Sequence, residues 1–202
     1  MLKALLLIDI QPDFLPGGAL AIADGDAILE PINQLLARDP YDLCVATQDW
    51  HPERHVSFAS THGRAPFDVI DLYGHPQTLW PDHCVQGTPG AGLDPRIHWD
   101  PVAAVIRKGS DVDADSYSGF RNNWNAHGQR PTTGLAGYLK ERGVTDVHLC
   151  GLARDFCVKW SAEDAAAAGF RTTVLWDLTR PVDPGSDARV RLDLEAAGAR
   201  IR

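Results

Sequence analysis

Cysteine and lysine are both scarce in this sequence. Each occurs only four times among 202 residues. Four cysteines in a chain of this length, without a secretory signal, predict reduced thiols rather than a disulfide framework. The cytoplasm is therefore the expected compartment.

Long hydrophobic runs are also missing. The first apolar run, Ala4–Ile8, is interrupted by Asp9, which makes it too short for a signal peptide or a membrane-spanning helix. No later run approaches the roughly 18 apolar residues that a spanning helix requires. We expect no membrane partner.

An excess of positive charge is the third absence. Lys and Arg together number 19 and Asp and Glu 27, which gives a net charge of −8 with neutral His. Nucleic acids and anionic membranes select concentrated positive charge, so the acidic balance argues against both. With 44% hydrophobic and 23% charged residues, the composition is that of a folded globular protein, and the length suggests one domain, residues 1–202.

Short apolar runs alternate with helical patterns along most of the chain. Runs that are apolar on both faces are typical of parallel strands covered by helices. The pattern predicts an α/β fold with an open, mostly parallel sheet and helices on both faces. The expected strands are Lys3–Ile8, Leu43–Thr47, Ala103–Arg107, Val147–Cys150 and Thr172–Leu175, with a further candidate at the extreme C-terminus. The expected helices are Asp26–Ala37, Thr133–Arg142, Phe156–Ala168 and Asp187–Ala197.

The segment from Asp49 to Pro101 does not follow this alternation. It is rich in Pro, Gly, His and aromatic residues and has no clear period. A segment this long without regular structure is uncommon in a compact domain unless it serves a function. It holds five of the eight histidines, at positions 51, 55, 62, 75 and 83, so we expect chemistry there.

Three apparent motifs are set aside. The glycines of residues 87–92 lack the strand and helix context of a nucleotide-binding loop. The segment Asp111–Asp115 opens like a calcium loop, but Ser116 stands where the sharp turn needs glycine. His51 and His55 have metal-ligand spacing only on a helix, and the proline between them argues against one.

Polar residues stand where two of the predicted strands end. Asp9 ends the first apolar run, and Lys108 ends the run before Gly109. Ligands of open parallel sheets bind at the carboxyl ends of the strands, so both residues are candidates for a site. Each alone is better explained as a solvated strand end or a surface charge.

Cys157 falls in the first turn of a predicted helix, shortly after a predicted strand. Free N–H groups and the positive end of the helix dipole lower the pKa of a thiol there and favour the thiolate. Position alone leaves two interpretations open: a nucleophile, or a small buried side chain, as many free cysteines are. For Cys44 and Cys150, which lie inside apolar strands, burial is the better interpretation.

Asp49 and His51 follow a predicted strand two residues apart. If the extended conformation continues, both side chains point to one face. A carboxylate and an imidazole suit a divalent transition metal, but two ligands do not complete a site. His83 is the best candidate for the third, because proline and aromatic residues stiffen its surroundings.

The motifs together strongly resemble those of the nicotinamidase family, within the isochorismatase-like cysteine hydrolase superfamily. The resemblance covers nearly the whole chain, and the pair Asp-x-His with a third histidine is what distinguishes this family from its relatives. The matching segments are Asp9-Ile-Gln-Pro-Asp-Phe14-Leu-Pro-Gly-Gly, Gln48-Asp-Trp-His51-Pro, Ser57-Phe-Ala-Ser, Trp80-Pro-Asp-His-Cys-Val-Gln86, Lys108-Gly, Asp115-Ser-Tyr-Ser-Gly-Phe120 and Gly151-Leu-Ala-Arg-Asp-Phe-Cys-Val-Lys159.

The resemblance implies roles for individual residues. It implies an oxyanion hole made by the N–H groups of Ala153 and Cys157, beside a cis peptide between Leu152 and Ala153. The implied groups are a catalytic triad of Asp9, Lys108 and Cys157, metal ligands Asp49, His51 and His83, and substrate contacts Phe14, Trp80, Tyr117 and Leu152.

The implied activity is hydrolysis of nicotinamide to nicotinate and ammonia through a thioester, in NAD salvage, with pyrazinamide as a second expected substrate. The expected partner is therefore a small molecule, with monomer and homo-oligomer both open. The expected cofactor is one divalent transition metal ion per site, zinc first, with iron and manganese as alternatives.

Two other functions compete with this one. Another cysteine amidohydrolase of the superfamily, acting on a carbamoyl or ureido substrate, would keep the triad without needing the metal ligands. A metal-binding or thiol-redox protein would use Cys84 and Cys157, but it leaves Asp9 and Lys108 unexplained.

The sequence departs from the family pattern at two positions. Pro12 replaces an asparagine that is common after Gln11, and Arg154 stands where threonine is common, close enough to change the charge around the nucleophile. Some relatives have a fourth metal ligand after the Asp-x-His pair, but the spacing of His55 is not persuasive.

Overall fold

A six-stranded sheet forms the centre of the computed structural model, which describes residues 2–38 and 40–202. Met1 and Asp39, which the expected domain 1–202 includes, lie outside the described residues. The strand order is β5-β2-β1-β6-β7-β8, and every pairing is parallel, which confirms the predicted fold class. The strands are β1 Leu2–Ile8, β2 Leu43–Asp49, β5 Val102–Lys108, β6 Val144–Leu152, β7 Arg171–Arg180 and β8 Arg200–Ile201.

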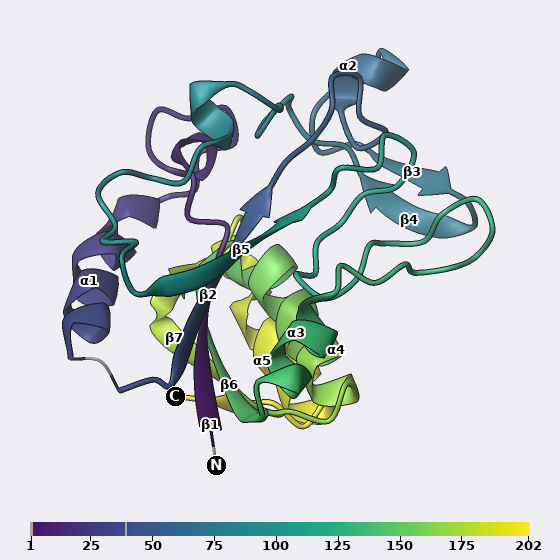
Figure 1. Ribbon diagram of the computed structural model, residues 1–202. Coiled ribbons are helices and arrows are strands. Elements are labelled where there is room, and N and C mark those ends of the chain that lie inside the picture. The colour runs from purple at the N-terminus through teal and green to yellow at the C-terminus, as the bar shows by residue number, and fades with distance from the viewer. Residues whose placement is uncertain (1, 39) are drawn as a thin grey trace.

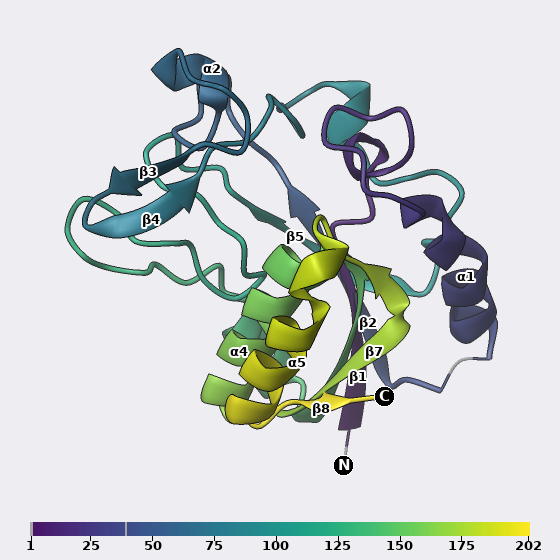
Figure 2. The same cartoon turned by 180° about the vertical axis from the view of Figure 1, so that it is seen from behind.

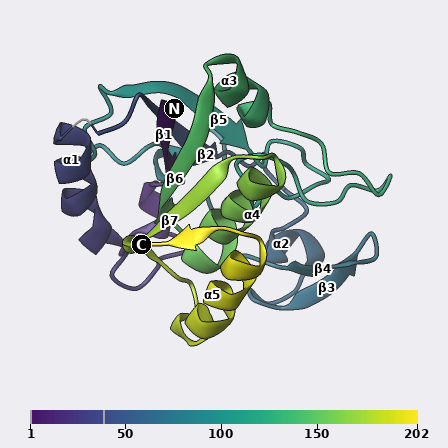
Figure 3. The same cartoon turned by 90° about the horizontal axis from the view of Figure 1, so that it is seen from below.

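Helices cover both faces of this sheet. Helix α1 lies on one face, and α3, α4 and α5 lie on the other (Figures 1 and 3). Within the described residues, no helix combines the length and apolar character needed to cross a membrane. The helices are α1 Leu29–Ala37, α3 Leu135–Glu141, α4 Lys159–Ala167 and α5 Asp187–Ala196.

Alternate side chains of β1 enter two different cores. Leu5 and Leu7 pack in the core that contains α1, whereas Leu6 and Ile8 pack in the core that contains α3, α4 and α5. All four side chains are fully buried. A strand buried on both faces requires an unbroken apolar run, which explains why residues 4–8 of β1 include no polar side chain.

The strand order places a switch point between β1 and β6. The chain adds β2 and β5 on one side of β1 and then adds β6, β7 and β8 on the other side. In open α/β sheets, ligands bind outside the carboxyl ends of the strands at such a point. Asp9 directly follows β1, and Cys157 follows β6, so the topology brings these two residues to the same edge.

The segment that shows no period in the sequence folds into short elements above this edge. It contains helix α2, Ala59–His62, and an antiparallel hairpin of β3, Val69–Leu72, and β4, His75–Thr78. Figures 1 and 2 show these elements beyond the carboxyl ends of β2 and β5, on the side away from both chain ends. The segment therefore covers the edge where the switch point lies.

The connection after β6 differs from the prediction. Instead of one helix over Phe156–Ala168, a π-helical turn, Arg154–Val158, precedes α4. The N–H of Val158 donates to the carbonyl of Ala153, five residues earlier, at 3.0 Å. Cys157 therefore lies in this wider turn rather than in the first turn of an α-helix, and such turns are frequent at functional sites.

Gly151 lies so close to the backbone of β1 that only glycine fits there. Its φ is +114°, and a Cβ atom there would lie 2.0 Å from the carbonyl oxygen of Ile8 in the neighbouring strand. We expect Gly151→Ala to lower the free energy of unfolding by about 3 kcal/mol or more, measured by urea titration.

Gly137 provides the matched control for this substitution. It lies exposed within α3, and nothing is within 4 Å of its added Cβ. Gly137→Ala should raise the free energy of unfolding by about 1 kcal/mol, because alanine favours a helix interior. Equal effects of the two substitutions would contradict the close-approach argument.

Candidate active site

Asp9 lies fully buried at the carboxyl end of β1, with φ at 46°. The Thr47 hydroxyl donates to its Oδ1 at 2.6 Å, and Lys108 Nζ lies 2.9 Å from its Oδ2. Within the described residues, Oδ2 is the one buried side-chain oxygen or nitrogen that makes no directed hydrogen bond. Burial raises the pKa of this carboxyl, although Lys108 opposes the shift. Oδ2 is thus a buried base with a free lone pair.

Lys108 brings the site residues together. Its side chain is fully buried, and Nζ lies 2.9 Å from carboxylate oxygens of both Asp9 and Asp49. It also donates to the Ser116 carbonyl at 2.7 Å and lies 3.6 Å from Cys157 Sγ. Burial disfavours the ammonium, but Asp49 and Asp9 outweigh it, and the pKa of Lys108 is well above its usual value. This residue is therefore a permanent buried cation between two carboxylates.

The surroundings of Cys157 contradict one expectation from the sequence. Burial raises the pKa of its thiol well above the usual value, and Lys108 offsets this only in part. The side chain is 6% exposed, so the desolvation of a thiolate outweighs the favourable dipole of the turn. The cysteine rests as a thiol and needs a base. The cis peptide that the resemblance implies is present between Leu152 and Ala153.

Asp49, His51 and His83 form a second buried group beside Lys108. Asp49 Oδ2 lies 3.0 Å from His51 Nε2 and 3.5 Å from His83 Nε2. His51 Nδ1 donates to the backbone carbonyl of Gly109 at 2.9 Å, and His83 Nδ1 donates to that of Pro81 at 2.8 Å. Because Nδ1 of each ring faces a carbonyl, Nε2 is the nitrogen that each histidine turns toward the Asp49 carboxylate.

This donor set fits a divalent cation. Ligating histidines ordinarily donate their second N–H to a carbonyl or carboxylate, as both do here. Asp9 and Asp49 carry two negative charges against the single positive charge of Lys108, so one negative charge is left in excess and favours the binding of a cation. Burial disfavours ionisation of Asp49, yet His51 and Lys108 hold its pKa well below the usual range. Its carboxylate is therefore ready to bind a metal.

His55 lies beside this group, which the sequence did not lead us to expect. Its ring centroid is 4.1 Å from that of His51, and potential ligand atoms of His51, His55 and Asp115 lie within 4.8 Å of one another. No helix is needed to bring the two histidines together. Burial and the neighbouring His51 lower the pKa of His55 to about 4, so its ring is neutral.

A narrow pocket opens onto Cys157 and Asp49. Three of the expected substrate contacts line it: Phe14, Trp80 and Tyr117. Leu152, the fourth expected contact, is not among the lining residues, and its side chain is fully buried in the core.

Phe156 lines the same pocket, although the sequence analysis assigned it no role. Its ring centroid lies 4.7 Å from that of Trp80 and 5.3 Å from that of Tyr117. Its place directly before Cys157 was the signal that could have identified it. The other lining residues are His83, Ala153 and Asp115, which lie in the matching segments, and Leu20 and Val182, which lie outside them.

The charge of Arg154, which could alter the surroundings of Cys157, is paired with Asp187. Its guanidinium contacts the Asp187 carboxylate at 2.7 Å and lies 4.0 Å from the Trp176 ring centroid. It also donates to the carbonyl of Thr179 at 2.8 Å. These contacts tie the π-helical turn to β7 and to the start of α5. The other departure, Pro12, begins the short 3-10 helix Pro12–Phe14, which positions Phe14.

Gln11 holds the backbone of Asp49 in place. Its Nε2 donates to the Asp49 carbonyl at 2.8 Å, and the Asp49 N–H donates to its Oε1 at 2.7 Å. Nε2 also donates to the carbonyl of Ala91. The side chain is fully buried and so makes, at the end of β2, the pair of bonds that a neighbouring strand would make.

Comparisons with known proteins agree with this geometry. The isochorismatase domain family matches residues 3–201. A nicotinamidase of Acinetobacter baylyi is 48% identical over 89% of this chain and 82% of its own length. The structure of a nicotinamidase and pyrazinamidase of Acinetobacter baumanii has a TM-score of 0.92 at 43% identity, covering 98% of this chain and 94% of that chain.

A zinc-containing structure is also similar. The pyrazinamidase of Pyrococcus horikoshii in complex with zinc has a TM-score of 0.79 at 34% identity, covering 100% of this chain and 99% of that chain. The family match spans nearly all of the sequence, and these relatives exceed 30% identity over most of both chains. The chain belongs to the isochorismatase family, among relatives that are nicotinamidases and pyrazinamidases.

Proposed function

We propose that this protein hydrolyses nicotinamide to nicotinate and ammonia, with Asp9, Lys108 and Cys157 as the catalytic residues. The observation that carries the proposal is the convergence of these three side chains at one pocket, with Asp49, His51 and His83 beside them. An amide placed in this pocket meets a thiol, a buried base and a cation. The family membership of the chain supports the same reaction.

The acylation step begins with the thiol of Cys157. Asp9 Oδ2 accepts the thiol proton, and the sulfur attacks the carboxamide carbon. A base whose pKa is raised by burial is better matched to a thiol than an ordinary carboxylate is. The Lys108 ammonium lies within 3.6 Å of the sulfur and stabilises the thiolate as it forms.

The tetrahedral intermediate then collapses to a thioester. The N–H groups of Ala153 and Cys157 stabilise its oxyanion, and each such donor contributes about 10²–10³-fold in rate. The carbon–nitrogen bond breaks as Asp9 returns its proton to the leaving nitrogen, which departs as ammonia. Asp9 then takes a proton from water, whose oxygen attacks the thioester. The carbon–sulfur bond breaks, Asp9 returns the proton to the sulfur, and the carboxylic acid loses its own proton to solvent and leaves as nicotinate.

The aromatic walls of the pocket and the proposed metal ligands orient the pyridine ring of the substrate. Phe14, Trp80 and Tyr117 present aromatic surfaces that favour a flat ring over a carbamoyl or ureido chain. Asp49, His51 and His83 would hold a divalent metal, which when bound offers a Lewis-acidic position for the ring nitrogen. The relative with bound zinc supports zinc first, with iron and manganese as alternatives. Pyrazinamide has a similar flat ring, and we expect it to be a second substrate.

Replacement of the nucleophile tests the reaction directly. Cys157→Ala should lower the rate of ammonia release from nicotinamide by at least about 10³-fold, because no other group can form the thioester. Metal content, measured by plasma emission spectroscopy, should stay at the wild-type level. Substantial deamidation by this variant would overturn the assignment of Cys157. A panel of amides, assayed after chelation and addition of individual metals, identifies the substrate and the metal.

Replacement of a proposed ligand tests the metal. His51→Ala should lose most bound metal and most activity, because two remaining protein ligands do not complete a site. His62→Ala is the matched control, since His62 is exposed, donates only to the carbonyl of Val56 and belongs to neither histidine group. Equal metal content in the two variants would remove His51 from the ligand set.

Gln11 offers a test of ligand positioning. Gln11→Leu breaks both bonds to the Asp49 backbone and should weaken metal binding by about 10–100-fold, measured by competition with a chelator. Gln48→Leu is the control, because Gln48 also donates to the Ala91 carbonyl but makes no bond to Asp49. Equal losses in the two variants would show that Gln11 acts only through general stability.

A further inference from the structure

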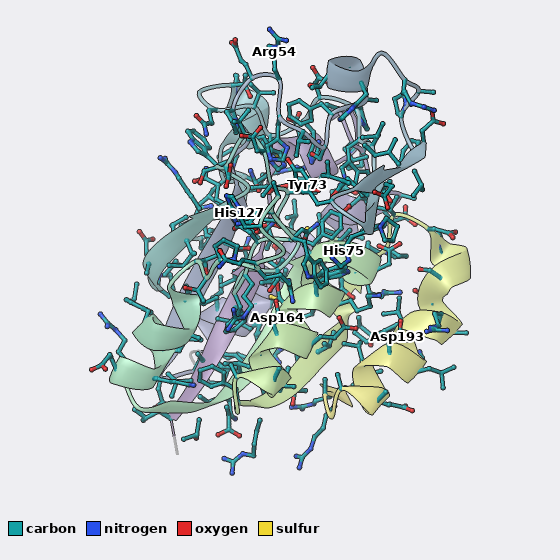
Figure 4. All side chains as sticks on the ribbon, turned by 90° about the vertical axis from the view of Figure 1, so that its right-hand side faces the viewer. Arg54, Tyr73, His75, His127, Asp164 and Asp193 are labelled. Atoms are coloured by element: carbon teal, nitrogen blue, oxygen red, sulfur yellow. The ribbon has the colours of Figure 1, made fainter. Side chains whose placement is uncertain are left out.

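A second cavity lies on the outer side of Tyr117. It has a volume of about 260 Å³ and is lined by the β3–β4 hairpin, the loop after Phe120 and helix α4. Three of its lining side chains are aromatic: His75, Trp124 and Trp160. Figure 4 shows His75 near the part of α4 that carries Asp164. Neither Cys157 nor any proposed metal ligand lines this cavity.

The first polar group of the cavity is the amide of Gln77, a residue that is 3% exposed. Its Nε2 lies 2.8 Å from the Thr78 carbonyl, 2.8 Å from the Asp115 carboxylate and 3.0 Å from the Tyr117 hydroxyl, so its two N–H groups are shared among three acceptors. A carbonyl and a carboxylate only accept, so the nitrogen must face them. Within the described part of the chain, Oε1 accepts no hydrogen bond.

The second polar group is the amide of Asn123, which is 7% exposed. Its Oδ1 accepts from the backbone N–H of Tyr117 at 3.3 Å. A backbone N–H only donates, so the oxygen must face it. No acceptor for Nδ2 occurs among residues 2–38 and 40–202.

The two amides therefore leave one acceptor and one donor for a ligand. Each amide is anchored at its other end to the segment 115–117, so its orientation is fixed before a ligand arrives. The Trp124 ring stacks on His75 at 4.0 Å and meets Trp160 edge to face at 6.2 Å, so aromatic rings line the cavity. The Arg130 guanidinium lies over both tryptophan rings, at 5.1 and 5.2 Å, and is paired with Asp164. A flat ring with one donor and one acceptor on the same substituent matches this combination.

We infer that this cavity binds a planar aromatic ring that carries a primary carboxamide. The carboxamide NH₂ donates to Gln77 Oε1, the carboxamide oxygen accepts from Asn123 Nδ2, and the ring packs against Trp124 and Trp160. A carboxylic acid anion binds less well, because both of its oxygens are acceptors and one of them faces Gln77 Oε1.

This binding site is separate from the catalytic pocket and goes beyond the proposed function. Tyr117 forms the wall between the two, since it lines the catalytic pocket while its hydroxyl accepts from Gln77. Its ring centroid lies 5.2 Å from that of Trp160, a lining residue of the outer cavity. One carboxamide can therefore occupy each site at the same time.

Titration calorimetry of nicotinamide into metal-loaded Cys157→Ala protein tests the inference. We expect two equivalents to bind in the parent variant. Adding Asn123→Asp should weaken one of them by about tenfold or more, because the new side chain keeps the acceptor for the Tyr117 N–H but replaces the donor with an acceptor. Nicotinate in place of nicotinamide should lose the same equivalent.

Asn125→Asp is the matched control. Asn125 lies two residues away, its Oδ1 accepts from the backbone N–H groups of His127 and Gln129, and it does not line the cavity. This variant adds the same charge and should keep both equivalents. Trp124→Leu removes one aromatic ring from the cavity and changes neither amide. It should also weaken the equivalent that binds in the outer cavity. This second variant keeps the test valid if Asn123→Asp does not fold.

The outcomes separate this inference from the proposed function. If nicotinamide binds in two equivalents and both Asn123→Asp and Trp124→Leu leave their affinities unchanged, the outer site is overturned. A single equivalent unaffected by these substitutions also overturns it. A single equivalent that these substitutions weaken supports the outer site, while showing that the catalytic pocket does not bind nicotinamide. Ammonia release by the wild-type protein reports on the proposed function independently.

Discussion

The buried ammonium of Lys108 is the interaction on which the site depends. Two carboxylates, those of Asp9 and Asp49, lie 2.9 Å from it. Both are buried, so water does not screen their charges. Removing one partner from such a group leaves an uncompensated buried charge, which costs about 3–5 kcal/mol. Lys108 also links two kinds of chemistry, because Asp9 faces the thiol side of the site while Asp49 faces the histidines. The base and the proposed metal ligands thus share one counter-ion.

The register of the parallel sheet determines this arrangement. Asp49, at the end of β2, is paired with Lys108, at the end of β5, and β1 lies on the other side of β2. Gly151 is paired with Ile8, so β1 and β6 run together up to the residues that precede Asp9 and the turn of Cys157. A one-residue slip in any pairing would move a site residue to the opposite face of the sheet. Catalytic geometry and sheet stability are therefore determined by the same backbone pairings.

The sequence predicted the residues that end strands, because parallel strands bring their carboxyl ends to one edge. This is why Asp9, Lys108 and Asp49 could be placed together before the structure was known. The position of Cys157 was predicted, but its thiol pKa was not, because a place in a turn does not reveal how deeply the sulfur is buried. His55, Phe156 and Gln77 were missed because they come from a segment without a period, or from a motif position without a distinctive side chain, and only tertiary folding brings them to the site.

The segment 115–117 shows how the rest of the fold enters the chemistry. Ser116 accepts from Lys108 through its carbonyl, while Tyr117 on the next position forms a wall of the catalytic pocket. Gln77 holds the hydroxyl of that tyrosine, and Asn123 holds its backbone N–H. A ligand bound to the outer ends of these two amides is therefore one side chain away from Tyr117, and Tyr117 is one residue away from the contact with Lys108. The catalytic pocket and the outer cavity are thus attached to the same three-residue segment through buried hydrogen bonds.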